Sequence, residues 1–359
     1  MQAKVKTAIY ALTPQGAELG SKLSAAMDAK LFLSSRLSCD YSCAASFDSL
    51  ANLIITTFNS YSSHIFITAT GIAVRSIAPH LGSKDRDPAV VVLDQDGKYC
   101  ISLVSGHLGG ANALARNVAD ITGGTAVITT ATDTAGLPAI DELASQLGLV
   151  VRDVPRIKII SAALLRSECV QLHDPEDILG LRAHSLFTVV ESLNAWNPDL
   201  PGVAVSFHNN PFFPGLPVVP ENTLVLHSRQ LAVGIGCRKG TSQKDILGVL
   251  ELVFTDNNLA LSSIAHLGSA TAKQDEPGLL QAAQTLGLDI AFFPSSELDR
   301  VPAPNPSPTV QRHVGTASVC EASAMLLGNT ETLLVEKTAY GNVTVAVAAI
   351  NTNNKENPC

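Results

Sequence analysis

The chain has 359 residues, enough for two or three domains at roughly 100–200 residues per domain. Hydrophobic residues make up 46% of the chain and charged residues only 16%, which excludes an intrinsically disordered protein. The formal net charge is −8, from 24 basic and 32 acidic residues, and it argues against a binder of nucleic acid or anionic membranes, because both need a basic surface.

The N-terminal part alternates short apolar runs with helical patterns. Strands are predicted at Thr7–Leu12, Leu53–Thr57, Ile65–Ala69, Val90–Leu93, Cys100–Val104 and Ala126–Thr129. Helices are predicted at Gly16–Ala29, Gly71–Leu81 and Gly110–Thr122. Short continuous apolar runs are typical of strands buried on both faces of a parallel sheet, so the pattern predicts an open α/β sheet.

The C-terminal part repeats this pattern after a proline-rich middle, in which strands and turns are expected rather than a regular α/β unit. Later strands are predicted at Leu231–Ile235, Ser263–His266, Leu288–Phe293, Thr332–Glu336 and Val343–Ile350, and helices at Ser242–Phe254 and Gly315–Leu327. The expected fold class is α/β, with two open α/β domains of mainly parallel sheets, residues 1–139 and 229–359. They flank a small middle domain, residues 140–228.

A glycine-rich loop, Ser105-Gly-His-Leu-Gly-Gly110, joins a predicted strand to a predicted helix. Such a loop lets the backbone approach a ligand and points free N–H groups and the positive helix end outward, which favours an anion or a developing oxyanion. His107 within it suits acid or base catalysis near neutral pH. The alternative is a tight packing turn with a surface histidine.

Two further predicted strands lead into polar residues. Ile65–Ala69 is followed by Arg75, and Ala126–Thr129 by Asp133. If these strands are parallel to the one before His107, all three carboxyl ends meet at one edge of the sheet, where ligands bind in open α/β proteins. Arg75 is then a candidate carboxylate clamp and Asp133 a candidate base or hydrogen-bond acceptor. Taken singly, Arg75 also suits a solvated helix face and Asp133 a helix cap.

A second glycine-rich loop, residues 234–242, follows the strand predicted at Leu231–Ile235. It lacks the Gly-Lys-Ser/Thr of a P-loop and the third glycine of the dinucleotide fingerprint. Arg238 and Lys239 make it basic at a helix start, which suits carboxylates. The alternative is a turn with two solvated cations.

The remaining motifs are weak. Cys39 and Cys43 lack the second pair of a zinc site, and the commonest metalloprotease and serine-hydrolase motifs are absent from the sequence. Surface or structurally satisfied positions are expected for His173, His184, His208, His227, His313 and Glu321.

The sequence also indicates where the protein resides. It contains no apolar stretch near the ~20 residues that cross a bilayer, and its first residues do not read as a signal peptide. Seven cysteines, an odd number, favour reduced thiols. We therefore expect a cytoplasmic protein without membrane or nucleic-acid partners, and a homodimer on the general frequency of twofold oligomers.

Several longer strings are distinctive. In the N-terminal part they are Gly71-Ile-Ala-Val-Arg75, Asp87-Pro-Ala-Val-Val91, Ser105-Gly-His-Leu-Gly-Gly-Ala-Asn112 and Ile128-Thr-Thr-Ala-Thr-Asp133. In the C-terminal part they are Gly234-Ile-Gly-Cys-Arg-Lys-Gly-Thr-Ser242, Pro304-Asn-Pro-Ser307 and Gly315-Thr-Ala-Ser-Val319 with Glu321. Together they resemble the cobalt-precorrin-5A hydrolase family of anaerobic cobalamin biosynthesis, over nearly the whole chain and least in the middle.

The resemblance implies a reaction on a cobalt-bearing, ring-contracted tetrapyrrole. Water opens its δ-lactone and acetaldehyde leaves, giving cobalt-precorrin-5B. The cobalt belongs to the substrate, so no cofactor or protein metal is expected. Transient contact with other enzymes of the pathway is also expected.

For this reaction we expect His107 or Asp133 to act as the general base, and the amides of Gly106–Gly110 to stabilise the oxyanion. The predicted substrate-binding residues are Arg75, Ser105, Gly106, Gly109, Gly110, Asn112, Thr130, Gly236, Arg238 and Lys239.

Two other functions stay open at this point. A non-catalytic carrier of a labile corrinoid intermediate would bind it without turnover. An enzyme acting on phosphorylated metabolites, suggested only by the glycine-rich loops, would be protected from heat by phosphate esters.

Overall fold

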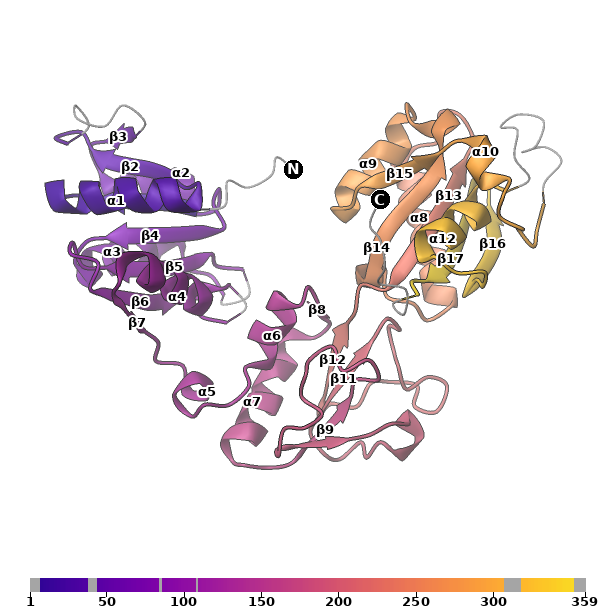
Figure 1. The fold of residues 1–359 in the computed structure, drawn as a ribbon, viewed down its shortest axis with the longest axis horizontal. Helices are drawn as coiled ribbons and strands as arrows, with labels where there is room; N and C mark the ends of the chain where they lie inside the picture. The colour runs from indigo at the N-terminus through magenta and orange to yellow at the C-terminus, as the bar shows by residue number, and fades with distance from the viewer. Residues whose placement is uncertain (1–6, 38–43, 84–85, 108, 307–317, 352–359) are drawn as a thin grey trace. The chain divides into compact units, whose positions relative to one another are not determined.

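The computed structural model describes residues 7–37, 44–83, 86–107, 109–306 and 318–351. Within these ranges three sheets with flanking helices form, and most neighbouring strands are parallel (Figure 1), which confirms the predicted α/β class. The chain divides into two compact units, Met1–Gln146 with Ile157–Glu168, and Leu147–Arg156 with Cys169–Cys359. The division into three domains at residues 139 and 228 stays a prediction.

The sheet of the first unit has seven strands in the order β3-β2-β1-β4-β5-β6-β7. They are β1 (Thr7–Ala11), β2 (Lys30–Ser34), β3 (Ala45–Phe47), β4 (Ser63–Ile67), β5 (Ala89–Leu93), β6 (Tyr99–Val104) and β7 (Thr125–Val127). Four helices cover its faces: α1 (Pro14–Met27) and α4 (Ala111–Thr122), and α2 (Leu50–Thr57) and α3 (Thr70–Ile77).

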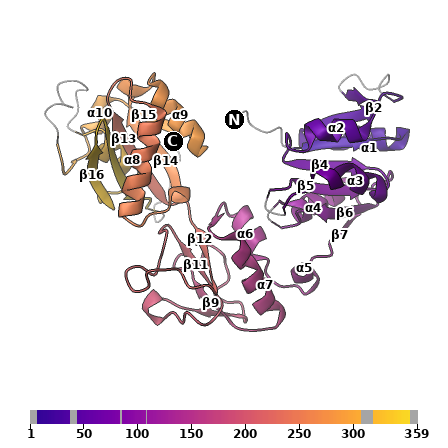
Figure 2. The ribbon, with the colours of Figure 1, turned by 180° about the vertical axis from the view of Figure 1, so that it is seen from behind.

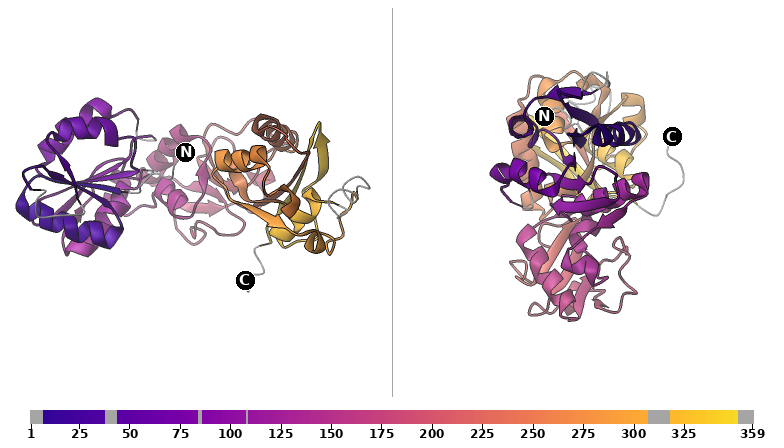
Figure 3. Two further views of the ribbon diagram at one scale, coloured as in Figure 1. Left: turned by 90° about the horizontal axis from the view of Figure 1, so that it is seen from above. Right: turned by 90° about the vertical axis from the view of Figure 1, so that its left-hand side faces the viewer.

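Both faces of this sheet are buried (Figure 3). Ile9 of β1 packs in a cluster with Leu23 of α1, whereas the next residue, Tyr10, packs in a cluster with Ile54 of α2 and Ile77 of α3. Because successive strand residues point to opposite faces, a strand apolar at every position needs helices on both sides. The strands of the sequence are apolar at every position because helices cover both faces of this sheet.

Strand β6 reverses the direction of the sheet. It pairs antiparallel with β5 because a tight turn, not a crossover helix, connects the two strands. In that turn the Asp94 carboxylate accepts the N–H groups of Asp96, Lys98 and Tyr99, and Gly97 adopts a φ of 70°. Strand β7 is parallel to β6, so both end at the edge opposite to the end of β4. The expectation that Arg75 shares an edge with His107 and Asp133 is therefore wrong.

The strand predicted at Leu53–Thr57 is also wrong, because these residues belong to helix α2. The Ser49 side chain caps the helix by accepting the Asn52 N–H at 3.4 Å. Leu50, Ile54 and Thr57 are buried at helical spacing, while Ile55 is 63% exposed. A short apolar run fits both periods, and the cap together with the buried face decides for the helix.

The middle sheet lies in the second unit and has the order β10-β9-β11-β12-β8. Its strands are β8 (Val150–Val151), β9 (Val170–His173), β10 (Phe187–Val189), β11 (Gly202–Ser206) and β12 (Thr223–His227). Strands β9 to β12 are parallel, and β8 joins antiparallel. This part of the chain also forms two helices that the sequence did not predict, α6 (Ile140–Gln146) and α7 (Ile157–Leu165), both in the first unit.

The C-terminal sheet has the order β15-β14-β13-β17-β16. Its elements are β13 (Leu231–Cys237), α8 (Gln243–Asp256), β14 (Ile264–Ala270), α9 (Pro277–Leu286), β15 (Ile290–Phe293), α10 (Ser295–Leu298), α12 (Cys320–Gly328), β16 (Val335–Tyr340) and β17 (Val343–Ala349). Helix α12 lies before the sheet in Figure 1 and α8 before it in Figure 2, seen from behind, so the two helices cover opposite faces. The last two strands form an antiparallel hairpin added to three parallel strands.

Some predictions concern residues outside the described ranges. These are Cys39, Cys43, His313 and the beginning of the helix predicted at 315–327, of which α12 is the described part. Across the ranges that are described, no helix has the length and apolarity needed to cross a membrane.

Candidate active site

The loop between β6 and α4 is compact because residue 109 is glycine. A Cβ at this position would lie 2.3 Å from the Cβ of Ser105 and 2.8 Å from its carbonyl oxygen. The same carbonyl accepts the Ala111 N–H at 3.0 Å, so the loop caps the first turn of α4. Through this turn the backbone brings His107 to the carboxyl ends of β6 and β7.

The His107 ring lies between two carboxylates. Its Nε2 is 2.8 Å from Asp133 Oδ2, and its Nδ1 is 3.3 Å from Asp141 Oδ1. Asp133 belongs to α5 (Ala131–Thr134), just after β7, and Asp141 to α6. The Asp141 residue is 5% exposed, whereas the His107 side chain keeps 16% of its surface in contact with solvent. The structure therefore places the two predicted catalytic residues, His107 and Asp133, in contact, and it adds Asp141 as a third ionisable residue of the cluster.

Asp133 is held by four donors. Thr130 Oγ1 and Asn112 Nδ2 donate to its Oδ2, as His107 does, and Arg116 Nη2 donates to its Oδ1. Asn112 is fully buried and also receives the Ser102 hydroxyl on its Oδ1 at 2.7 Å. Asn112 and Thr130 thus position the Asp133 carboxylate, and the substrate contacts that the sequence predicts for them stay a prediction.

Arg116 extends the cluster to a third carboxylate. Its Nη1 donates to Glu142 Oε1 at 2.8 Å, and Gln146 Nε2 donates to the same oxygen at 3.2 Å. His107, Asp133 and Glu142 bring ligand atoms within 4.8 Å of one another, a set that has the chemistry of a divalent-metal site. The Arg116 guanidinium bridges both carboxylates, so each of them is already paired with a cation of the chain itself.

The two carboxylates set the proton affinity of His107. Asp141 beside Nδ1, and then Asp133 beside Nε2, outweigh burial and raise the pKa of His107 to about 9. Burial acts to raise the pKa of Asp133, but the bonds from Thr130 and His107 and the charge of Arg116 outweigh it and hold that pKa below its usual value. At neutral pH the ring is therefore an imidazolium, and it is suited to giving a proton rather than taking one.

This proton affinity can be measured directly. We expect His107 to titrate near pH 9 by NMR of histidine-labelled protein, and Asp141→Asn to lower that pKa towards 6.5. Because the folded pKa is raised, the stabilisation is fully present below about pH 6.5 and is lost as pH rises through about 9. Asp48→Asn, which removes an exposed carboxylate of the same unit, should leave the titration unchanged. A His107 pKa at or below 6.5 in the unmodified chain would contradict this assignment.

The loop amides are only partly available as oxyanion donors. The Gly110 N–H is used by the His107 carbonyl at 2.8 Å. The N–H groups of Gly106 and Gly109 donate to no described residue, and the Ser105 Oγ is sealed from solvent without a hydrogen-bond partner in that part of the chain. Among the predicted donors, the N–H groups of Gly106 and Gly109 therefore remain available to stabilise an oxyanion.

The other predicted binding residues lie elsewhere. Arg75 is exposed on α3 and donates to the Gly71 carbonyl at 3.2 Å. Arg238 and Lys239 are exposed after β13 in the second unit, and Gly236, the last residue but one of that strand, pairs with Thr344 of β17. Arg75 follows a strand that ends at the edge of the sheet opposite to His107, and the contacts predicted for Arg238 and Lys239, which belong to the other unit, stay a prediction.

Sequence reasoning missed three members of the cluster, Arg116, Asp141 and Glu142. Arg116 carried a detectable signal, because it follows Asn112 by one helical turn and lies on the same face of α4. Asp141 and Glu142 follow no strand and match no motif, so only the folded chain places them beside His107.

An α/β sheet with an acid–base cluster at the carboxyl ends of two strands defines the chain as an α/β protein equipped for proton transfer. Residues 52–133 match the family described as Cobalamin synthesis G N-terminal, residues 138–226 match Cobalamin biosynthesis central region, and residues 231–348 match Cobalamin synthesis G C-terminus.

Similar proteins agree with these matches. A cobalt-precorrin-5A hydrolase of Priestia megaterium is 32% identical over 84% of this chain and 82% of its own length. A cobalt-precorrin-5A hydrolase of Salmonella typhimurium is 35% identical over 95% of this chain and 96% of its own. The protein CobE of Sinorhizobium sp. is 28% identical over 33% of this chain and 79% of its own. The chain belongs to the cobalt-precorrin-5A hydrolase family and has a hydrolase role in cobalamin biosynthesis.

Proposed function

We propose that this protein hydrolyses the δ-lactone of cobalt-precorrin-5A and releases acetaldehyde to give cobalt-precorrin-5B. The relatives named for this activity, which match most of the chain, support the substrate. The observation that carries the chemistry is the His107 ring, protonated between Asp133 and Asp141 at the ends of β6 and β7.

In this proposal His107 is first a general acid, which revises the general-base role expected from the sequence. Water adds to the lactone carbonyl, and the C–O bond to the ring oxygen breaks as the tetrahedral intermediate collapses. His107 gives its proton to the departing alkoxide, and the attacking water passes both of its protons to solvent as the new carboxylate forms. The looser side of the ring, Nδ1 at 3.3 Å from Asp141, is the side from which the proton leaves.

The same residue then serves the second step. The neutral imidazole takes back the proton of the new hydroxyl group, the carbon that carried it becomes the carbonyl of acetaldehyde, and the C–C bond to the macrocycle breaks. The electron pair of that bond passes into the conjugated ring system. Asp133 holds Nε2 at 2.8 Å throughout, as a positioning residue rather than a base.

In this proposal the substrate is bound by backbone N–H groups and by cationic side chains. The N–H groups of Gly106 and Gly109 face the developing oxyanion, a contact worth roughly 3–4 kcal/mol in other hydrolases. Arg238 and Lys239, and separately Arg75, pair with the acetate and propionate groups of the substrate. The chain itself contributes no metal or cofactor in this proposal, because the cobalt arrives with the tetrapyrrole.

The cellular setting is proposed as well. We assign the protein to the cytoplasm as a homodimer that makes transient contacts with other enzymes of the same pathway. Light scattering coupled to size-exclusion chromatography tests the dimer, and a mass of about 37.6 kDa, that of one chain, would contradict it.

The decisive experiment is anaerobic incubation of purified protein with cobalt-precorrin-5A, followed by an assay for acetaldehyde. We expect one acetaldehyde per cobalt-precorrin-5B formed. Tight binding of the substrate without release of acetaldehyde would overturn the hydrolase and leave a carrier of corrinoid intermediates. Protection from heat by phosphate esters but not by tetrapyrroles would point instead to a phosphorylated metabolite.

A further inference from the structure

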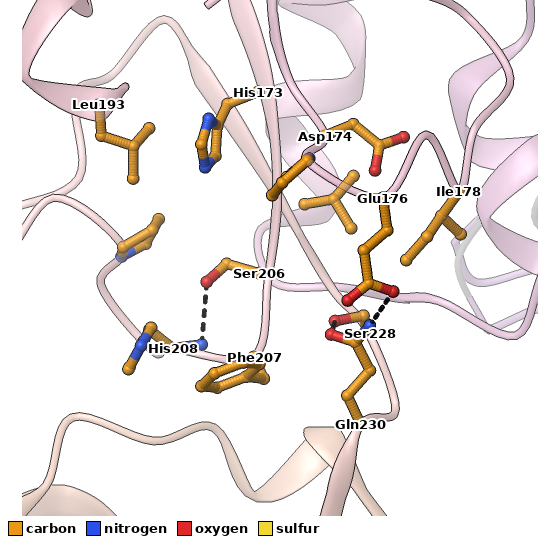
Figure 4. Close-up of a pocket in the computed structure, with 13 residues that line it drawn as sticks. His173, Asp174, Glu176, Ile178, Leu193, Ser206, Phe207, His208, Ser228 and Gln230 are labelled. Carbon is orange, nitrogen blue, oxygen red and sulfur yellow. Dashed lines mark hydrogen bonds between the residues drawn. The ribbon is translucent and has the colours of Figure 1, made fainter. Parts of the chain in front are cut away.

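A second group of polar side chains lies in the middle sheet and shares no residue with the cluster around His107. A cavity of about 230 Å³ sits at the carboxyl ends of the parallel strands β9 and β11 (Figure 4). His173 ends β9 and Ser206 ends β11, and both line the cavity. The outer edge of parallel strands is where α/β sheets bind ligands, so the position marks this cavity for recognition.

The tautomer of His173 follows from one contact. Its Nδ1 lies 2.8 Å from the carbonyl oxygen of Val190. A carbonyl only accepts hydrogen bonds, so Nδ1 carries the proton and Nε2 presents a lone pair. In the described part of the chain nothing hydrogen-bonds to Nε2, and Figure 4 shows the ring directed into the cavity. A histidine whose other ring nitrogen is tied to a backbone carbonyl has the arrangement of a metal ligand.

The rest of the lining selects against anions. It contains no lysine or arginine, and it includes the carboxylates of Asp174 and Glu176. Apolar side chains such as Leu193, Val205 and Phe207 supply much of the remaining surface. This cavity therefore does not suit the carboxylates of a tetrapyrrole, whereas an apolar macrocycle face with a metal at its centre fits both the apolar surface and the free lone pair.

The other histidine of the cavity, His208, offers at most its Nε2 to a ligand. The Nδ1 of His208 is sealed from solvent without a hydrogen-bond partner in the described residues, and its ring packs against Phe207 at 4.5 Å between centroids. A ligand atom on the cavity side cannot reach that nitrogen without moving the ring. His208 is thus a matched control for His173.

We propose that His173 Nε2 is an axial ligand to the cobalt of the bound corrinoid substrate. The inference rests on the proposed function, because the cobalt belongs to that substrate. At about 230 Å³ the cavity is smaller than the roughly 300–1,000 Å³ pockets that enclose drug-sized ligands, so the macrocycle lies across it and only the axial side of the metal faces in. The imidazole holds the tetrapyrrole by its metal, and no bond of the substrate is made or broken there.

The test uses Co(II) cobinamide, a stable corrinoid without its own nucleotide base, and electron paramagnetic resonance under anaerobic conditions. A nitrogen ligand on the axis of low-spin Co(II) splits each cobalt line into a triplet, and ¹⁵N-histidine labelling turns the triplet into a doublet. We expect this splitting with the unmodified protein and with His208→Ala, and its loss with His173→Ala. Loss of the second-shell partner of a metal-bound histidine typically costs 10–100-fold in affinity, so His173→Ala should weaken cobinamide binding by roughly that factor or more.

Three results would overturn the assignment: no nitrogen splitting in the unmodified protein, splitting that persists in His173→Ala, or no binding of cobinamide. Acetaldehyde release from cobalt-precorrin-5A, measured on the same preparations, separates this inference from the proposed function. Release without nitrogen splitting rejects the cobalt ligand and keeps the hydrolase. Splitting without release rejects the hydrolase and keeps a corrinoid-binding protein.

Discussion

Replacement of His107 by alanine should lower acetaldehyde release from cobalt-precorrin-5A by about 10²–10⁴-fold, the range that a positioned acid or base contributes. The reason is geometric, because no other described proton donor lies between the carboxylates of Asp133 and Asp141 at the site. Asp133 keeps its bonds from Thr130, Asn112 and Arg116 in the variant, so this carboxylate stays paired although the imidazolium is lost.

The alanine variant would leave the buried carboxylate of Asp141 without its partner, the His107 ring. An unpaired buried charge lowers the stability of the folded protein. His107→Gln therefore accompanies the alanine variant, since glutamine still donates a hydrogen bond but cannot deliver a proton. His266→Ala, which removes an exposed histidine of the second unit, is the matched control and should keep full activity. Acetaldehyde release from a folded His107→Gln at the rate of the unmodified protein would move the acid role to another residue.

The second large effect is expected at Gly234, on the face of β13 that meets helix α12. A Cβ there would lie 1.8 Å from the carbonyl oxygen of Cys320 and 2.7 Å from its carbonyl carbon. Both atoms are backbone, so the whole helix would have to move away from the sheet. We expect Gly234→Ala to destabilise the second unit by about 3 kcal/mol or more, beyond the usual cost of overpacking. Urea unfolding followed by circular dichroism measures it.

Gly248 provides the control for this substitution. It lies inside α8, where an added Cβ meets no atom within 4 Å. Alanine is the better helix former by roughly 0.5–1 kcal/mol, so Gly248→Ala should raise the stability that Gly234→Ala lowers. If both variants unfold at the urea concentration of the unmodified protein, the close contact between β13 and α12 is not present in solution.

Local patterns predicted many of the strands and helices of the first and last sheets. Continuous apolar runs predicted β1, β4, β5 and β6, because strands covered on both faces have no polar side, and helical spacing predicted α1, α4 and α8. The strand predicted at Leu53–Thr57 is wrong because a five-residue apolar run fits the period of a strand as well as that of a helix. Burial of Leu50 and Ile54 against the sheet favours the helix. The distinctive strings around His107 and Arg238 also sufficed for the family resemblance, and the family matches confirm it.

Tertiary structure decided the direction of β6 and, with it, the membership of the site. The Asp94 turn makes β5 and β6 antiparallel, which separates Arg75 from His107 although each follows a strand in the sequence. Strand direction depends on how the connection packs, and the apolar period of a strand is the same in both directions.

The sequence by itself determined the class of the fold, the family, and the pair His107 and Asp133. Only the folded chain added Arg116 of α4 and the neighbouring Asp141 and Glu142 of α6, which share no motif in the sequence. The charges of Asp141 and Asp133 also decide what His107 does. An imidazole with an ordinary pKa would serve as base or acid near neutral pH, whereas two carboxylates at its nitrogens raise the pKa to about 9 and make it an acid. Proton affinity depends on distances between charges, and these distances exist only once the three segments have packed together.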